Sequence, residues 1–329
     1  MLPKNRMELA FSILRDVYKL TENEIAELDP ATLAQRLQGI HNGWNAEHEF
    51  GAIASWLGHC KLVTHPDEVY SSNGSLRVPD FLIVSQVKDR EVPFLVEVKT
   101  TEDDRLVWSA KYRDSLKKFA DMLGMPVLVA WKRYGLWSLC DLSEFHLAET
   151  AYHLTWEAAM KNNLMTALCG NVFITVNEGF RFELTYELLD EAAGSADLLP
   201  EGQYAAQIVE AGLFTPKGKI SGQLSSELFP LFLTKAAEPI TRREGKLLHH
   251  IFPVEAEGMF NLSDLLFTHL TWNKEEPSDL NWIVEIRKGL PANERDLHTV
   301  LREAIDVQAV RYVLSQQPER IPPFLSGLL

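Results

Sequence analysis

Several common sequence signatures are missing from this chain of 329 residues. It has no run of about 18 apolar residues, the length that a membrane-spanning helix requires. Its charged N-terminal stretch lacks the uninterrupted apolar core of a signal peptide. The three cysteines, Cys60, Cys140 and Cys169, fit neither a disulfide framework nor a CxxC metal site. We therefore expect a soluble protein of the reducing cytoplasm with no membrane segment.

Motifs of several enzyme classes are also absent. The chain has no GxxxxGK[ST] phosphate loop and no GxGxxG turn, so nothing indicates an internal ATPase. It also has no GxSxG nucleophile elbow. The net charge of −14 argues against a general polyanion binder. Four histidines, His41, His48, His59 and His65, lie near one another in the sequence. Their spacing matches no zinc pattern, so we expect structural roles for them.

Positive charge is nevertheless concentrated in one segment. Between residues 105 and 133, seven basic residues stand against two acidic ones. Such an excess is typical of a solvated helix face and also of the edge of a phosphate-binding groove. Both interpretations remain open at this point.

Length and pattern predict more than one domain, because a domain usually takes about 100–200 residues. We expect a helical segment over residues 1–38, an α/β domain over 39–150 and an accessory α+β domain over 151–329. In the α/β domain, helices and strands alternate in a way that predicts a mixed sheet flanked by helices. Its expected elements are a helix ending at Gly58, a hairpin over 78–99, a helix over 108–123 and a strand over 126–133. In the accessory domain they are a connecting helix over 148–165, a hairpin over 170–188, and helices over 261–270, 279–289 and 293–315.

The stretch RVPDFLIVSQVKDREVPFLVEVKTT carries polar residues at one end of the first predicted hairpin. If the turn is centred between Lys88 and Asp89, Asp80 stands opposite Glu97, and both side chains project to one face. Lys99 lies two residues farther on and shares that face. Opposed carboxylates repel each other, and a bound divalent cation would reverse the sign of that interaction. The register therefore predicts a cation site at this end of the hairpin.

Phosphodiester hydrolysis uses such a combination of side chains. Asp80 and Glu97, with the main-chain carbonyl of Val98, would offer hard oxygen ligands to Mg²⁺ or Mn²⁺. Lys99 would orient the attacking water, act as its base if its pKa is depressed, or stabilise developing charge. The simpler alternatives are a turn-capping role for Asp80 and a surface ion pair between Glu97 and Lys99.

Pro79-Asp80, followed after 16 residues by Glu97-x-Lys99, resembles the PD-(D/E)XK signature of restriction-endonuclease-like nucleases. The resemblance covers about residues 40–147. It implies a restriction-endonuclease-like mixed sheet and a Mg²⁺-dependent endonuclease. DNA is the favoured substrate, and RNA is the second candidate.

The helix before the hairpin, GWNAEHEFGAIASWLG, is similar in spacing to the opening of archaeal Holliday-junction resolvases. In the nuclease family a Glu on this helix often supports the metal site. Glu47 and Glu49 are the two candidates for this role. The simpler alternative for Glu47 is that it is an ordinary exposed helix residue. We prefer Glu47, because it neighbours the small residues Gly51 and Ala54, which would let the helix approach the sheet closely.

Basic and aromatic residues after the motif are candidates for binding nucleic acid. Trp108 and Tyr112, predicted to lie one helical turn apart, would stack on unpaired bases. Lys111, Arg113 and Lys117 would contact phosphates. Many relatives carry a Gln on this helix, and Lys111 or Tyr112 would occupy the equivalent face.

The acidic half of the chain, 151–329, carries no motif of recognisable chemistry, and its charge disfavours duplex binding. We expect it to mediate homo-oligomerisation or to bind a protein partner that holds or silences the nuclease. A role in prokaryotic defence or in a mobile element follows by family analogy. Two alternatives remain: a non-catalytic nucleic-acid-binding or assembly subunit on the same fold, and an RNase with the same site.

Overall fold

The structure is a computed structural model that describes residues 46–66, 76–189, 205–220, 222–256, 258–271 and 297–329. It is a mixed α/β structure with four sheets. The predicted helices over 1–38 and 279–289 lie outside the described residues. Within these residues, no helix is both long and apolar enough to cross a membrane.

The first sheet has the strand order β1-β2-β3-β5-β6. β3 and β5 are parallel and are joined through helix α4, and the other neighbours are antiparallel. β5 is an almost continuous apolar run because a central strand in a covered sheet is buried on both faces. The elements are β1 (Cys60–Thr64), β2 (Phe81–Val87), β3 (Arg90–Thr100), α4 (Ala110–Leu123), β5 (Val127–Arg133) and β6 (Leu136–Asp141).

The register of the β2–β3 hairpin is the predicted one. Phe81 pairs with Val96 and Val87 pairs with Arg90, which leaves Lys88 and the residue after it as a two-residue turn. Lys88 adopts a positive φ of 52°, as a tight hairpin turn requires. The end of the hairpin that carries the motif is therefore aligned as the sequence predicts.

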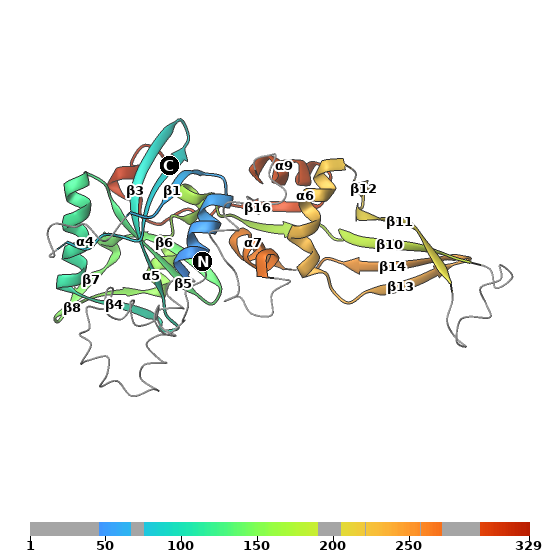
Figure 1. Cartoon of the computed structure of the whole chain (residues 1–329), viewed down its shortest axis with the longest axis horizontal. Helices are drawn as coiled ribbons and strands as arrows, with labels where there is room; N and C mark the ends of the chain where they lie inside the picture. Colours follow the sequence, from blue (N-terminus) through green and yellow to red (C-terminus); the bar gives the residue numbers. More distant parts are fainter. Residues whose placement is uncertain (1–45, 67–75, 190–204, 221, 257, 272–296) are drawn as a thin grey trace, which may run out of the picture.

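Different elements cover the two faces of this sheet. A helix over residues 46–56 packs on one face, where Phe50 contacts the core side of the hairpin. α4 packs on the other face together with a small sheet of order β4-β8-β7, and Leu95 of β3 belongs to this second cluster. Figure 1 shows the two helices on opposite sides of the sheet. Because side chains alternate along β3, Glu97 and Lys99 project with Leu95 toward α4. The small sheet consists of β4 (Arg105–Ser109), β7 (His146–Ala148) and β8 (Ala151–Thr155).

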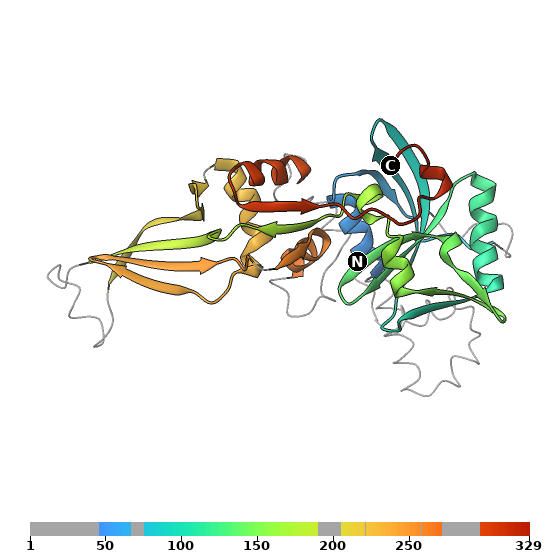
Figure 2. The same cartoon turned by 180° about the vertical axis from the view of Figure 1, so that it is seen from behind.

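The second half of the chain forms two further antiparallel sheets. A five-stranded sheet of order β12-β11-β10-β14-β13 extends away from the first sheet as a long arm (Figures 1 and 2). Its strands are β10 (Arg181–Leu188), β11 (Ala206–Thr215), β12 (Gly218–Ile220), β13 (Ile240–Glu244) and β14 (Leu247–Pro253). A three-stranded sheet of order β15-β9-β16 comprises β9 (Phe173–Val176), β15 (Met259–Asn261) and β16 (Val310–Leu314). Helices α6 (Gly222–Phe232), α7 (Leu262–Thr271) and α9 (Leu297–Asp306) accompany these sheets.

Three predictions for this half are wrong and one is confirmed. The expected hairpin over 170–188 does not form, because β9 and β10 pair with distant strands in different sheets. The expected helix over 148–165 is instead strand β8, which pairs with β4, followed by the short helix α5 (Trp156–Lys161). The expected helix over 293–315 divides into α9 and strand β16, and the helix over 261–270 is present as α7. In each error a long-range strand pairing overrides the local pattern.

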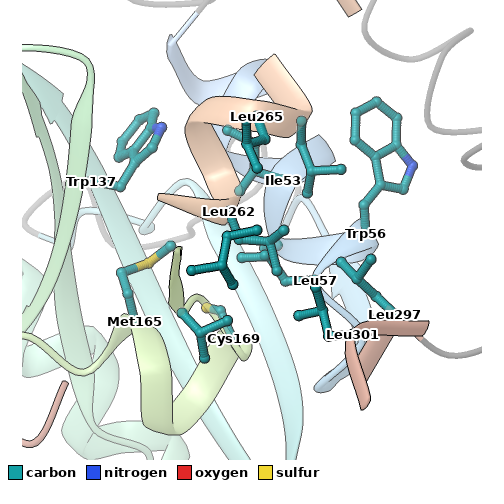
Figure 3. Close-up of a cluster of buried hydrophobic side chains, with 14 of the residues drawn as sticks. Ile53, Trp56, Leu57, Trp137, Met165, Cys169, Leu262, Leu265, Leu297 and Leu301 are labelled. Atoms are coloured by element: carbon teal, nitrogen blue, oxygen red, sulfur yellow. The ribbon is translucent and has the colours of Figure 1, made fainter. Parts of the chain in front are cut away.

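One hydrophobic cluster joins elements from both halves of the chain. Ile53 of helix 46–56 and Leu57 directly after it lie among Leu262 and Leu265 of α7 and Leu301 of α9 (Figure 3). The helix that covers the first sheet therefore also packs against the second half. The domain boundary near residue 150 remains a prediction.

Candidate active site

The end of the β2–β3 hairpin brings Asp80 against the backbone of β3. Asp80 lies immediately before β2, and its Oδ2 accepts a 2.6 Å hydrogen bond from the amide of Val98. Glu97 is the neighbouring residue on β3, and its side chain is only 1% exposed. The hairpin register thus holds two carboxyl groups at one sheet end, both largely removed from water.

Lys99 neutralises part of this negative charge. Its Nζ donates to Oε1 of Glu97 at 2.5 Å and to the carbonyl oxygen of Val98 at 2.9 Å. These acceptors are two of the three groups predicted to bind a metal ion. The ammonium group of Lys99 therefore lies against two of the oxygen groups that a metal ion would take.

Two further side chains surround Glu97. The hydroxyl of Tyr112, on the first turn of α4, donates to Oε1 of Glu97. The guanidinium of Arg77 lies 4.5 Å from the centre of the Tyr112 ring, and its Nε lies 4.0 Å from the same carboxylate oxygen. Sequence analysis did not single out Arg77. The signal was its position three residues before Asp80, within the same polar end of the hairpin.

The electrostatics of the site follow from burial and crowded carboxylates. Burial raises the pKa of Asp80 well above its usual range, and the negative charges of Glu97 and Glu47 raise it further. Burial alone would lower the pKa of Lys99, but Glu97, Tyr112 and Asp80 together shift it upward. Lys99 is therefore protonated at neutral pH in this arrangement. The predicted alternative of Lys99 as a base requires a depressed pKa, and this arrangement shifts the pKa the other way. That role of Lys99 stays a prediction.

The structure separates the two candidate glutamates on helix 46–56. Glu47 is near enough to Asp80 for its charge to raise the pKa of that carboxyl group. Glu49 is buried elsewhere, where it accepts hydrogen bonds from Nζ of Lys132 at 2.7 Å and from Nε1 of Trp137 at 3.0 Å. These contacts tie the helix to β5 and β6, so Glu49 has a structural role.

Replacing each of these glutamates by glutamine should have opposite effects on stability and on cleavage. We expect Glu49→Gln to lower the free energy of unfolding by about 2 kcal/mol, because half-buried Lys132 loses a charged partner. Cleavage per folded molecule should be unchanged. We expect Glu47→Gln to lower any cleavage roughly tenfold and to leave stability nearly unchanged. Urea unfolding and cleavage assays on both variants check this, and the reverse pattern would restore Glu49 as the site residue.

The residues predicted to bind nucleic acid have different environments. Trp108 lies on β4, not on a helix, and it is buried in a stack with Phe145 at 4.6 Å. The prediction that Trp108 stacks on bases is therefore wrong. The ring of Tyr112 is occupied in the same way, by Trp108 at 4.9 Å and by Arg77. These contacts place Tyr112 beside Glu97, and its predicted stacking on bases stays a prediction.

The three predicted phosphate contacts lie on α4. Lys111 is exposed, and Lys117 is exposed beside Asp121 with an ion pair at 2.7 Å. The guanidinium of Arg113 lies 4.3 Å from the centre of the Tyr152 ring and is mostly covered. Lys111 and Lys117 are exposed on this helix, whereas Arg113 is held against the small sheet, and phosphate binding by these residues stays a prediction.

The donors at the hairpin end fit Mg²⁺ or Mn²⁺ chemically. In the described part of the chain, no three His, Cys, Asp or Glu side chains are grouped to hold a metal ion. The candidate ligand set is instead Asp80, Glu97 and the carbonyl of Val98, which suits Mg²⁺ because this ion takes one or two carboxylates and keeps several waters. Oε2 of Glu97 is buried and accepts no hydrogen bond from any described residue, as expected of an atom reserved for another ligand.

We expect Tyr112→Phe to test how Glu97 is held. Loss of the hydroxyl removes one hydrogen bond to the carboxylate and should lower the free energy of unfolding by about 1 kcal/mol. If Tyr112 positions Glu97 for a metal, Mn²⁺ affinity should also fall roughly tenfold. Isothermal titration with Mn²⁺ separates the two effects, since a purely structural role would leave the affinity of the folded protein unchanged.

Comparisons with known proteins give a weak similarity. No family model matches the chain, and no curated protein matches it. The solved structure of Archaeoglobus fulgidus Hjc, described as a Holliday junction resolvase from an archaeal hyperthermophile, matches with a TM-score of 0.25 and 18% identity. The match covers 30% of this chain and 76% of the other. Because this TM-score is too low to show a shared fold, we base the function on the geometry of this chain.

Proposed function

We propose that this protein is a metal-dependent nuclease whose active site is the end of the β2–β3 hairpin. The observation that carries the proposal is the convergence of Asp80, Glu97 and Lys99 on one face of a sheet end. Glu47, on the helix that covers the opposite face of the sheet, is near enough to Asp80 to add a third negative charge. Crowding three carboxyl groups beside one ammonium group and the more distant guanidinium of Arg77 is costly unless the site has a use for a further cation.

The roles of the residues follow from their contacts. Asp80, Glu97 and the Val98 carbonyl would hold Mg²⁺ or Mn²⁺, with Glu47 supporting the site. The ion would supply Lewis-acid activation of the attacking water and of the phosphate. Lys99 keeps its proton, so it orients the water and stabilises the charge that develops on the phosphate. Another group or the solvent accepts the proton from the water.

In this proposal DNA is the favoured substrate and RNA is the second candidate. The enzyme would cleave bonds inside the strand and not at its ends. Exposed Lys111 and Lys117 beside the site would attract the phosphate backbone. We place the nuclease in residues 39–150 and assign residues 151–329 to homo-oligomerisation or to a protein partner that controls activity. A cytoplasmic role in prokaryotic defence or in a mobile element completes the proposal.

One observation favours a second candidate function. Nζ of Lys99 already bonds Glu97 and Val98, so the hairpin end is partly neutralised without a metal. A protein that uses the same fold only to bind nucleic acid or to assemble a complex would have the same arrangement. Such a protein would not bind Mn²⁺ through Asp80.

The direct test is cleavage by the full-length protein. Supercoiled plasmid, single-stranded DNA and RNA are each incubated with Mg²⁺, with Mn²⁺ or with EDTA. Cleavage that requires a divalent ion supports the nuclease and identifies its polymer. If no substrate is cleaved and calorimetry detects no Mn²⁺ binding, the non-catalytic function is the correct one.

A further inference from the structure

A hollow of about 640 Å³ lies beside the sheet formed by β15, β9 and β16. Its lining comes from β9, from β16 and from the segments that follow β9 and precede β15. The lining residues are Thr175, Val176, Glu178, Ala256, Arg311 and Tyr312. Figure 2 shows β16 in red between the long arm and the first sheet. No part of the Asp80 site contributes to this hollow.

A β-bulge determines which side chains face the hollow. Val310 pairs with Val176 and Val313 pairs with Ile174, and the side chains of these two pairs lie in or against the core. Arg311 is the extra residue between Val310 and the pair formed by Tyr312 and Thr175. In a regular strand Arg311 and Tyr312 would point to opposite faces, whereas a bulge re-aims one of them. As a result, both side chains line the same hollow.

The outer face of this sheet is open to solvent at its aromatic position. Tyr312 is 54% exposed, and the guanidinium of Arg311 lies 5.1 Å from the centre of its ring. Met259 of β15, which pairs with Thr175 from the other side of β9, is 57% exposed. An exposed aromatic ring beside an exposed guanidinium offers a ligand one flat apolar surface and one positive charge.

The polar atoms of the hollow are arranged for a ligand. The hydroxyl of Thr175 is buried and has no hydrogen-bond partner among the described residues. Buried polar groups are normally hydrogen-bonded, so this hydroxyl lacks a partner that such a group usually has. Glu178, which lines the hollow together with Arg311, carries a carboxylate that can accept a hydrogen bond. The hollow therefore combines one flat apolar ring, one cation and two hydrogen-bonding groups.

We propose that this hollow binds an unpaired nucleotide of single-stranded nucleic acid, an inference that rests on the proposed nuclease function for its choice of polymer. The base stacks on the ring of Tyr312, and the adjacent phosphate pairs with Arg311. Thr175 and Glu178 bond to the edge of the base. The hollow would thus hold an unpaired strand away from the Asp80 site and limit where the nuclease acts.

The charge of the hollow decides between nucleotide ligands. Arg311 and Glu178 have opposite charges, so the hollow presents no excess of positive charge. A free nucleoside triphosphate would bring several negative charges against one guanidinium. One nucleotide within a strand brings a single phosphate, which matches a single arginine. Duplex DNA keeps its bases stacked and cannot present one to Tyr312.

Binding of labelled oligonucleotides to the full-length protein tests the proposal. Fluorescence anisotropy is measured in EDTA, where no metal-dependent cleavage occurs, with single-stranded DNA, single-stranded RNA and duplex DNA. We expect Tyr312→Leu to weaken single-strand binding about tenfold, and Tyr312→Phe to bind within about twofold of wild type. We expect Arg311→Gln to weaken it several-fold and to reduce the salt dependence by roughly one ion contact.

Arg302→Gln is the matched control for Arg311→Gln, because Arg302 is an exposed arginine on the adjacent helix α9 and lies outside the hollow. It should bind as wild type. If Tyr312→Leu and Arg311→Gln also bind single strands as wild type does, or if wild type binds none, the proposal is overturned. A change in sedimentation in these variants, with oligonucleotide binding unchanged, would make the hollow a protein interface and would overturn it as well.

This experiment separates the hollow from the active site. A protein that never cleaves but loses single-strand binding in the Tyr312 and Arg311 variants overturns the nuclease and retains the nucleotide site. A protein that cleaves, with single-strand binding unchanged in those variants, retains the nuclease and overturns the nucleotide site.

Discussion

Asp80→Asn is expected to abolish metal-dependent cleavage, lowering its rate by at least roughly 10²–10³-fold, the usual cost of losing one electrostatic contact to the reacting centre. The amide has the same shape as the carboxyl group and can still accept the hydrogen bond from Val98. The variant therefore loses one charged metal ligand without losing the contact that holds the hairpin end. Initial rates on the substrate that wild type cleaves measure the effect.

The same variant should be more stable than wild type at neutral pH when no metal is present. Burial, Glu97 and Glu47 raise the pKa of Asp80 in the folded protein above its value in the unfolded chain. The stability that protonated Asp80 contributes is full below the unfolded pKa and is lost as the pH rises through the folded pKa. Asp80→Asn removes this loss, so its Tm should exceed that of wild type at pH 7 but not below about pH 4.

Asp89→Asn is the matched control for Asp80→Asn. Asp89 is exposed at the turn of the same hairpin, at the end opposite to Asp80. Both cleavage and the pH dependence of Tm should match wild type in this variant. Equal activity in wild type and Asp80→Asn would remove Asp80 from the site, even if the protein proved to be a nuclease.

Lys99→Met should produce the second large effect, a loss of cleavage together with a gain in metal affinity. Cleavage should fall by roughly 10²–10⁴-fold, because the water and the phosphate lose their nearest fixed ammonium group. Mn²⁺ should bind more tightly, because Nζ no longer competes for Glu97 and Val98. Without metal, the variant should lose about 3 kcal/mol of stability, since the buried carboxylate of Glu97 is left without its cation.

Adding Mn²⁺ should therefore raise the Tm of Lys99→Met more than that of wild type. A site filled at one hundred times its dissociation constant contributes about 2.7 kcal/mol. The control is Lys161→Met, which breaks an exposed lysine–glutamate pair on α5, with Nζ 2.8 Å from Glu157, and should leave stability nearly unchanged. If Mn²⁺ binds neither wild type nor Lys99→Met, the ammonium is a permanent substitute for the metal and the non-catalytic function is favoured.

Local pattern was sufficient for the hairpin and for the helix that follows the motif. Apolar residues alternate along both strands, and a two-residue turn centred at Lys88 permits one register, so the opposition of Asp80 and Glu97 followed from counting residues. The helix after the motif ends as expected at Gly124, whose φ of 64° caps it. Helix α7 was found for the same reason, because its apolar spacing is local.

Long-range contacts produced everything that the pattern missed. Trp108 lies in a strand because β8 pairs with β4, and this pairing buries the ring that was expected to stack on bases. Tyr112 bonds Glu97 only because α4 crosses the face of the sheet to which Glu97 projects. The role of Glu49 depended on Lys132 and Trp137, which lie more than 80 residues away in the sequence.

The residues of the hairpin and their spacing were enough to predict which side chains share one face at the candidate site. Turn length and side-chain alternation determine this, and both act over a few neighbouring residues. Packing between distant segments determined the rest: which glutamate faces Asp80, which cation bonds Glu97, and which strands meet in the second half. It also created the bulge that places Arg311 beside Tyr312. The free energy of such contacts is gained only when both partners are present, and a pattern of neighbours specifies only one of them.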